Sequence, residues 1–390
     1  MNLSMRIKKV LFFCKGDSRK ASTWSNVPYL FCKTLEEKGI DVVRINTSFS
    51  IIESIWNKTI YLISKKIFKG NEYSAMRTFW MNYLISKKIK NAVLHNSDAD
   101  LCIFIGFSYY NQFNSIPSLL FGDWTFEILI KDRLKRSPFF FEKWVINREN
   151  NAIKNANIVI SLFPQCAKQI EYYVSNSKVF WGERNVINTL YNNNIDTNKI
   201  IKGKNDSHKI LFVGRKQYIK GAELLVNTYI ELLNIYPLLE LHIIGLNKTD
   251  FKYSRIPKGV HFYGFLRKEN AIECNLYYQL LLTSKVFVNP SPSWGGYSST
   301  IEAMYYYTPI IISPYDDFVE EFGENIDFGL YNNNFTHECL KNNLLNIMQS
   351  SKDKYYSMCL SAHDKVKNYT WNSYTSWLIK ICEESLIKKE

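Results

Sequence analysis

The sequence predicts an α/β protein with parallel sheets, arranged in two domains. Short apolar runs alternate with longer segments of helical periodicity along the chain, which is the pattern of repeated βα units. The runs around Leu101 and Ile158 are apolar throughout, as expected of strands that are covered on both faces. A chain of 390 residues has room for two domains of ordinary size.

The individual strands and helices follow from these runs. In the first half, the predicted strands are residues 9–13, 41–45, 101–106, 118–121, 158–162 and 178–180. In the second half, they are residues 209–213, 241–244, 260–263, 286–289 and 309–313. Between the first two strands, residues 27–38 place Leu30 and Leu35 on one face, which predicts a helix.

A polar stretch marks the expected domain boundary. Residues 195–208 lack apolar periodicity and predict a linker, so the domains are expected at 1–200 and 201–368. Residues 369–390 are expected to form a terminal helix that packs back on the N-terminal domain. Two similar α/β domains imply a cleft between them, which is the usual place for a substrate.

The composition excludes several classes of protein. Apolar residues make up 46% and charged residues 22% of the chain, as in a globular protein and not in a disordered one. The eight cysteines have no CxxC or CxxH spacing, so no metal site or disulfide framework is expected, and a reducing compartment is the simplest context. No apolar run reaches the about 18 residues of a membrane span, and the first is too short for a signal peptide. We therefore expect a cytoplasmic protein.

The net charge of +13 is concentrated near the N-terminus. Residues 1–90 contain 17 Lys and Arg against 6 Asp and Glu, whereas the remaining residues contain 32 against 30. Such asymmetry indicates an anionic partner for the basic segment. Nucleic acid, acidic lipid head groups and phosphorylated substrates are all compatible with it.

The first chemical motif is KILFVGRKQYIKGAELL, residues 209–225. A predicted strand ends at Val213, Gly214 turns the chain, and Arg215 and Lys220 precede a helix that is expected to begin near Gly221. Two cations beside a helix N-terminus can clamp a diphosphate. Two solvated surface cations are an equally good interpretation of this segment taken alone.

The second motif is VFVNPSPSWGGYSSTIEAMYYYTPIIIS, residues 286–313. The glycines at 295–296 allow the backbone to approach a ligand, and the hydroxyls of residues 298–300 are expected to cap the following helix. Glu302, expected in the first turn, could accept hydrogen bonds from a ribose diol. A capped helix with an ordinary acid near its N-terminus is the alternative.

Together the two motifs resemble the glycosyltransferase group 1 family. The matching residues are Gly214, Arg215, Lys220, Gly221, Pro290, Ser291, Gly295, Glu302, Ala303 and Met304. The resemblance implies the GT-B fold, in which two Rossmann-like domains face each other across a cleft. It also implies a retaining enzyme in which Arg215 and Lys220 hold the donor diphosphate and Glu302 holds the nucleotide ribose.

One position departs from the family pattern. The family has two glutamates eight residues apart, and the position of the first one, eight residues before Glu302, is occupied by Trp294 in this chain. The resemblance then leaves that role near the donor sugar to the backbone and hydroxyls of the adjoining residues. These donor-side candidates are Gly295, Gly296, Tyr297, Ser298 and Ser299.

In the N-terminal half, three loops that follow predicted strands carry further candidates. The acceptor-side candidates are Asp17, Ser22, Trp24, Asn26, Trp124, Glu183 and Arg184. The resemblance implies that the first of these loops faces the donor phosphates and the acceptor, which makes Gly16 a donor-side candidate. Asp123 stands where many family members have a His, so it is a candidate to orient the acceptor, and capping of the next helix is the alternative.

Residues 51–90 contain two basic segments with aromatic and aliphatic residues at roughly helical spacing. A basic amphipathic helix with aromatics suits an anionic membrane surface. The alternative is that these helices cover the N-terminal sheet and that their lysines are solvated. No nucleic-acid-binding motif accompanies the charge, so nucleic acid is not expected as a partner.

The sequence therefore predicts a retaining, metal-independent hexosyltransferase without a cofactor. The donor is expected to be a UDP- or GDP-linked sugar, and the acceptor a glycan or a lipid-linked glycan in bacterial surface polysaccharide synthesis. The chain is expected to act in the cytoplasm or at the inner face of the membrane. A nucleotide-sugar epimerase and a non-catalytic GT-B-like partner subunit are the alternatives.

Overall fold

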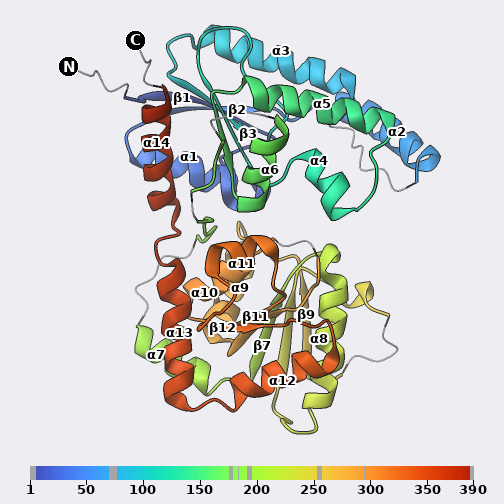
Figure 1. Cartoon of the computed structure of the whole chain (residues 1–390), viewed down its shortest axis with the longest axis vertical. Coiled ribbons are helices and arrows are strands. Elements are labelled where there is room, and N and C mark those ends of the chain that lie inside the picture. The colour runs from blue at the N-terminus through green and yellow to red at the C-terminus, as the bar shows by residue number, and fades with distance from the viewer. Residues whose placement is uncertain are drawn as a thin grey trace. The chain divides into compact units, whose positions relative to one another are not determined.

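The computed structural model describes residues 6–69, 77–174, 179–182, 184–190, 196–252, 257–293 and 296–386. The chain divides into two compact units, the first formed by Met1–Asn185 with Trp371–Glu390 and the second by Val186–Thr370. Each unit contains one parallel six-stranded sheet with helices around it (Figure 1). The predicted α/β class with parallel sheets is thus confirmed, while the units divide at Asn185 and not near residue 200.

The sheet of the first unit has the order β2-β1-β3-β4-β5-β6. Its strands are β1 (Lys9–Cys14), β2 (Asp41–Asn46), β3 (Leu101–Ile105), β4 (Ser118–Gly122), β5 (Ile158–Ser161) and β6 (Val179–Phe180). Every predicted strand of this half is present, although residue 178 lies outside the described residues. All of β4 and β5 is buried, because helices cover both faces of a parallel sheet.

The helices of the first unit flank this sheet. They are α1 (Val27–Glu37), α2 (Ile51–Ile67), α3 (Phe79–His95), α4 (Phe126–Ile128), α5 (Phe140–Asn155), α6 (Pro164–Val174) and α14 (Trp371–Leu386), with short turns at Thr23–Asn26 and Leu129–Arg133. The last helix, α14, lies beside α1 (Figure 1), where the rings of Phe31 and Trp371 are 5.1 Å apart. The chain thus returns to the first unit at its C-terminal end.

The two basic segments of residues 51–90 behave differently. Helix α3 buries Met81, Ile85, Ile89 and Val93, which lie at a spacing of four, so this helix covers the sheet as the alternative interpretation expected. Helix α2 instead leaves large apolar side chains exposed, and these are Ile55, Trp56, Leu62, Ile63 and Ile67. No described helix is both long and apolar enough to cross a bilayer.

The sheet of the second unit has the order β12-β11-β10-β7-β8-β9. Its strands are β7 (Lys209–Val213), β8 (Glu240–Ile244), β9 (Val260–Gly264), β10 (Val286–Asn289), β11 (Ile310–Ile312) and β12 (Gly329–Tyr331). The predicted strands are all present, and β12 was missed. Its three residues, Gly-Leu-Tyr, form no apolar run, so only pairing with β11 makes this segment a strand.

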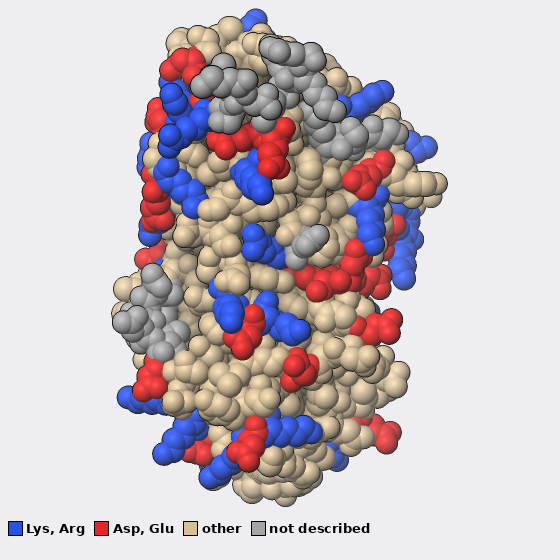
Figure 2. All heavy atoms as spheres, turned by 60° about the vertical axis from the view of Figure 1, so that its left-hand side comes forward, with Lys and Arg blue, Asp and Glu red and all other residues tan. Residues whose placement is uncertain are grey.

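The helices of the second unit cover a large apolar core. They are α7 (Thr197–Asn205), α8 (Ile219–Leu232), α9 (Ala271–Thr283), α10 (Ser298–Tyr305), α11 (Asp316–Phe322), α12 (His337–Met348) and α13 (Lys352–Val366), with short turns at Lys216–Tyr218 and Lys248–Asp250. On the face of the second unit that carries α7 and α13, Lys and Arg side chains alternate with Asp and Glu among uncharged areas (Figure 2). This face of the second unit therefore carries charges of both signs.

The predicted linker is wrong over Thr197–Asn205, which form α7. Asp196 caps this helix by accepting a hydrogen bond from the Lys199 amide, at 3.1 Å. Ile201 and Lys204 are buried. The Lys204 ammonium donates to the carbonyl of Ser284 at 3.2 Å, to the hydroxyl of Thr308 at 2.8 Å and to the carbonyl of Leu281. Lys204 is therefore a buried position occupied by a charged residue type. The apolar periodicity that predicts a helix is incomplete in this segment for that reason.

Candidate functional site

The two motifs meet at one edge of the second sheet. β7 and β10 are neighbouring parallel strands, so their carboxyl ends lie at the same edge, where α/β proteins commonly bind ligands. The loop after β7 and the loop after β10 are in direct contact there. The Ser291 hydroxyl donates to the carbonyl of Tyr218 at 3.3 Å, and the Tyr218 hydroxyl donates to the carbonyl of Gly296 at 3.2 Å.

Glycines make this contact possible. A Cβ at Gly221 would lie 2.2 Å from the Ser291 hydroxyl oxygen and 2.7 Å from its backbone nitrogen. A Cβ at Gly245, whose φ is +92°, would lie 2.3 Å from the carbonyl oxygen of Gly214. Both distances are far below contact distance, so a side chain at either position would push the loops apart.

The two predicted phosphate-binding cations are exposed at this edge. Arg215 follows β7 and its guanidinium lies 5.1 Å from the centre of the Phe265 ring, a distance typical of a cation–π contact. Lys220 lies in the first turn of α8, which begins at Ile219. Tyr218 at the N-cap contributes no capping side chain. The helix N-terminus, Arg215 and Lys220 therefore offer positive potential around one loop.

Glu302 lies deeper in the helix than predicted. Helix α10 begins at Ser298, which places Glu302 in the second turn and not in the first. The predicted capping by residues 298–300 is also wrong, because these residues are inside the helix and the N-cap is Tyr297, which makes no side-chain cap. Tyr297 is buried and its hydroxyl donates to Glu321, whereas Ser298 is exposed and Ser299 half-buried.

The Glu302 carboxylate is held by two residues that the sequence did not single out. Lys268 donates to Oε1 at 2.7 Å and Tyr277 donates to Oε2 at 2.7 Å. Lys268 also donates to the carbonyl of Asn188 at 3.0 Å. Burial and the neighbouring Glu302 charge raise the pKa of Tyr277 well above its ordinary value, so this hydroxyl stays a donor. Each carboxylate oxygen keeps a further lone pair that could accept from a ligand hydroxyl.

The loop after β1 carries five of the N-terminal candidates. Gly16 has φ +100° and its amide donates to the Asn46 side chain at 3.1 Å. The Asp17 carboxylate accepts from the Arg19 amide at 3.0 Å, which closes a turn. Ser22 is exposed.

Strained backbone follows in the same loop. Trp24, Ser25 and Asn26 all have left-handed φ, from +40° to +72°, which is uncommon for residues other than glycine and concentrates at functional sites. Trp24 is 37% exposed and Asn26 is buried. The loop thus presents a tryptophan at the carboxyl edge of the sheet.

The loop after β4 carries Asp123 and Trp124. Asp123 does not cap the next helix, because Thr125 does so by accepting from the Ile128 amide at 3.3 Å. Burial raises the pKa of the Asp123 carboxyl, although the Trp124 amide donates to it at 2.8 Å. The Trp124 ring stacks on the Phe163 ring with centres 4.7 Å apart, so one face of the tryptophan is covered by the protein itself.

The remaining candidates are only partly placed. Arg184 is half-buried in the segment after β6, and Glu183, Gly295 and Trp294 lie outside the described residues. The described donor-side candidates of the second unit therefore lie in or directly after the loops that follow β7 and β10. In the first unit, the loops of Gly16 and Asp123 follow β1 and β4, which β3 separates, so both lie at the carboxyl edge of that sheet.

The chain is similar in structure to known glycosyltransferases. Sucrose-phosphate synthase from Thermosynechococcus elongatus matches with a TM-score of 0.67 and 15% identity, over 97% of this chain and 98% of that one. The catalytic domain of starch synthase IV from Arabidopsis thaliana, bound to ADP and acarbose, matches with a TM-score of 0.65 and 12% identity, over 98% and 100%. WaaG, a glycosyltransferase involved in lipopolysaccharide biosynthesis, matches with a TM-score of 0.62 and 12% identity, over 95% and 99%.

These similarities cover nearly the whole chain and establish the GT-B fold of two Rossmann-like units. No curated protein matches the chain in sequence. A family model described as Glycosyl transferases group 1 matches residues 207–349, a range that contains both loops at β7 and β10. The resemblance to the glycosyltransferase group 1 family is thus confirmed over residues 207–349, and the fold and this match together support a glycosyltransferase.

Proposed function

We propose that this chain is a retaining glycosyltransferase that takes its sugar from a nucleoside diphosphate sugar bound to the second unit. The observation that carries the proposal is the contact between the loop of Arg215 and Lys220 and the segment that leads to Glu302. One cationic and one anionic group at a single sheet edge suit the two ends of a nucleoside diphosphate, its phosphates and its ribose.

The proposed chemistry depends on stabilising the leaving group. Arg215, Lys220 and the N-terminus of α8 would take up the negative charge that develops on the diphosphate as the glycosidic bond breaks. This is the role a divalent cation would otherwise fill, so we propose that the reaction is independent of metal. Glu302, oriented by Lys268 and Tyr277, would accept hydrogen bonds from the ribose hydroxyls.

The donor sugar would lie beside the start of α10. The family's first acid is replaced by Trp294, so the amides of Gly295, Gly296 and Tyr297 and the hydroxyls of Ser298 and Ser299 would contact the sugar instead. On the acceptor side, Asp123 would orient the acceptor hydroxyl, because its raised pKa makes the carboxylate a better acceptor. Asp17, Ser22, Trp24 and Asn26 would contact the rest of the acceptor.

We further propose a lipid-linked acceptor at an anionic membrane surface, in bacterial surface polysaccharide synthesis. Helix α2 supports this, since Trp56, Ile63 and Ile67 are each more than half exposed and Lys65 and Lys66 are exposed beside them. An exposed apolar stripe with lysines suits a bilayer interface. The structural likeness to WaaG, which acts in lipopolysaccharide biosynthesis, is in keeping with this role.

Calorimetric titration with UDP-, GDP- and ADP-sugars tests the donor site. We expect the sugars of one nucleotide to bind. Arg215→Ala, Lys220→Ala and Glu302→Gln should each raise the activation free energy of turnover by a few kcal/mol. Lys216→Ala is the matched control, because Lys216 lies in the same loop but pairs with Asp250 at 3.0 Å. Unchanged binding and turnover in all three site variants would reject this site.

The replacement of the family's first acid by Trp294 also supports a second candidate function, that of a partner subunit that binds a nucleotide sugar without transferring the sugar. The two functions differ in their products. A retaining glycosyltransferase, incubated with the donor that it binds and with extracts of lipid-linked glycans, should form a glycoside. NMR of this glycoside should show the same anomeric configuration as the donor sugar. Nucleotide binding without release of nucleoside diphosphate under any acceptor would favour the partner subunit.

A further inference from the structure

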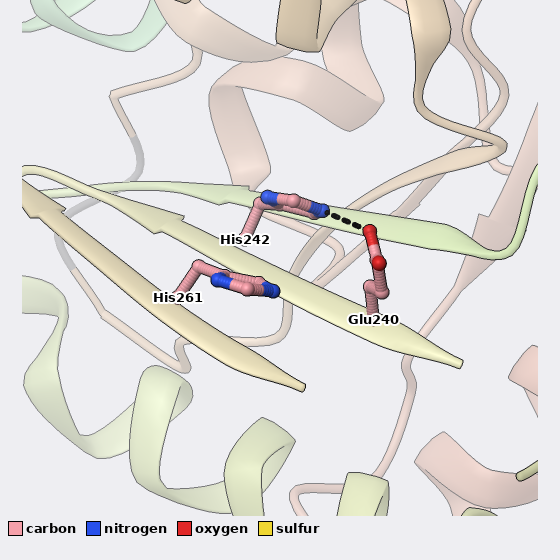
Figure 3. A group of neighbouring side chains, drawn as sticks. All are labelled: Glu240, His242 and His261. Carbon is pink, nitrogen blue, oxygen red and sulfur yellow. Dashed lines mark hydrogen bonds and ion pairs between the residues drawn. The ribbon is translucent and has the colours of Figure 1, made fainter. Parts of the chain in front are cut away.

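Three side chains with metal-binding atoms lie together on one face of the second sheet (Figure 3). Glu240 and His242 are two residues apart on β8, and His261 on β9 is the register partner of His242. Since side chains alternate along a strand, all three project to the same face. One carboxylate oxygen and one nitrogen from each imidazole lie within 4.8 Å of one another.

The spacing of these side chains is compatible with their sharing one metal ion. The Glu240 carboxylate lies 3.1 Å from Nε2 of His242, and the two imidazoles are nearly parallel, with centres 4.9 Å apart. Figure 3 shows both rings extending towards the Glu240 carboxylate. Zinc bonds of about 2.0–2.2 Å to N and O hold neighbouring ligand atoms roughly 3.3 Å apart. Glu240 and His242 already have this spacing, and side-chain rotations that shorten the remaining separations would bring all three ligands onto one ion.

A further contact orients the His242 imidazole. Its Nδ1 lies 2.7 Å from the Tyr263 hydroxyl, which could accept the ring proton and leave the Nε2 lone pair for the ion. Partners of this kind fix the orientation of metal-binding histidines.

We propose that Glu240, His242 and His261 bind a zinc ion, with a water molecule in the remaining position. Two imidazoles and one carboxylate select a borderline metal such as Zn²⁺ over Mg²⁺ or Ca²⁺, which prefer oxygen ligands. The ion would tie the edge strand β9 to β8. Glu240 is the first residue of β8, so this site lies at the sheet edge opposite the β7 and β10 loops and is separate from the proposed nucleotide site.

One neighbouring charge opposes the ion. Lys209 on β7 is the register partner of Glu240, so its positive charge lies on the strand next to the cluster. Glu240 offsets this charge locally. Lys209→Gln is therefore expected to tighten zinc binding, a change in the opposite direction from the loss of any ligand.

Calorimetric titration of the full chain with ZnCl₂ at pH 7.5 tests the site. Cys274 and Cys339, which are half-buried, are replaced by Ser in every variant so that their thiolates do not contribute. We expect one zinc per chain and at least about tenfold weaker binding in His261→Ala and Glu240→Gln, since even outer partners of a metal site are worth that much. MgCl₂ should give no binding.

His95→Ala is the matched control, because His95 is also exposed but lies on α3 of the first unit. Titration with Co²⁺ gives an independent readout, since a tetrahedral site produces intense visible absorption that His261→Ala should abolish. The proposal is overturned if zinc does not bind saturably, or if His261→Ala and His95→Ala bind zinc equally well. Neither outcome bears on nucleotide binding, which is measured without metal.

Discussion

Lys268 and Glu302 form an ion pair of 2.7 Å in which the lysine side chain is 15% exposed and the glutamate 5%. The lysine comes from the segment between β9 and α9, and the glutamate from α10. Because the Tyr277 hydroxyl binds the other carboxylate oxygen, the pair fixes both the charge and the orientation of Glu302. The carboxylate proposed to hold the ribose is therefore in place before any ligand binds.

Breaking this pair from one side should destabilise the second unit. Lys268→Met leaves a buried carboxylate with the Tyr277 hydroxyl as its remaining described donor, and we expect a loss of about 3 kcal/mol in the free energy of unfolding. Urea denaturation measures it. The double variant Lys268→Met with Glu302→Gln should cost much less than the sum of the single variants. Strictly additive losses would show that the two side chains are not coupled.

Gly221→Ala should separate the loops of the donor site. The new methyl group would lie 2.2 Å from the Ser291 hydroxyl and 2.7 Å from its backbone nitrogen, which is expected to cost about 1–3 kcal/mol and to weaken nucleotide binding. Gly203→Ala is the control, because nothing lies within 4 Å of its added carbon in α7, and it should stabilise by about 0.5–1 kcal/mol. Thermal unfolding with and without nucleotide compares them, and equal effects would contradict the close-contact argument.

Lys204 should make stability depend on pH in an unusual range. Burial lowers the pKa of its ammonium to about 7 from 10.5, so between these values the unfolded chain binds a proton that the folded chain lacks. Stability from this group is therefore complete above pH 10.5, falls as the pH drops to about 7, and is constant below that. The slope is at most about 1.4 kcal/mol per pH unit.

Lys204→Met isolates this contribution, because other groups titrate equally in both proteins. The free energy of unfolding of the wild type minus that of Lys204→Met should increase from pH 7.5 to pH 9, as measured by urea denaturation at both values. A difference that does not change with pH would mean that the folded ammonium keeps its ordinary pKa.

Helix α2 should bind anionic membranes through its exposed apolar side chains. We expect Trp56→Ser and Ile63→Ser each to lower the affinity for phosphatidylglycerol vesicles by roughly tenfold or more, as measured by cosedimentation. The reason is that each large apolar side chain contributes about 1.5–3 kcal/mol when it is buried. Neither change should affect stability. Ile272→Ser is the control, because Ile272 is 81% exposed but lies on α9 of the second unit. Equal retention by all three variants would exclude α2 as the contact.

The sequence by itself determined the two sheets and the donor motifs. Strand β3 and the first three residues of β5 are continuous apolar runs, because covering helices demand apolar residues on both faces of a parallel strand. The Gly-Arg and Lys-Gly positions of residues 214–221 were equally identifiable, since they match a family motif and place two cations before a predicted helix. Local pattern was enough wherever one segment's own burial or backbone fixed the residue type.

Only the tertiary structure decided which residues complete the site. Lys268 and Tyr277 reach Glu302 from 34 and 25 residues away. The separate cluster of Glu240, His242 and His261 likewise depends on strand pairing, which brings the His261 ring to His242. Helix α7 and strand β12 exist because distant acceptors bind Lys204 and a neighbouring strand pairs with Gly329–Tyr331. Hydrogen bonds and ion pairs between distant segments leave no periodic trace in the sequence, because periodicity records only which face of an element is buried.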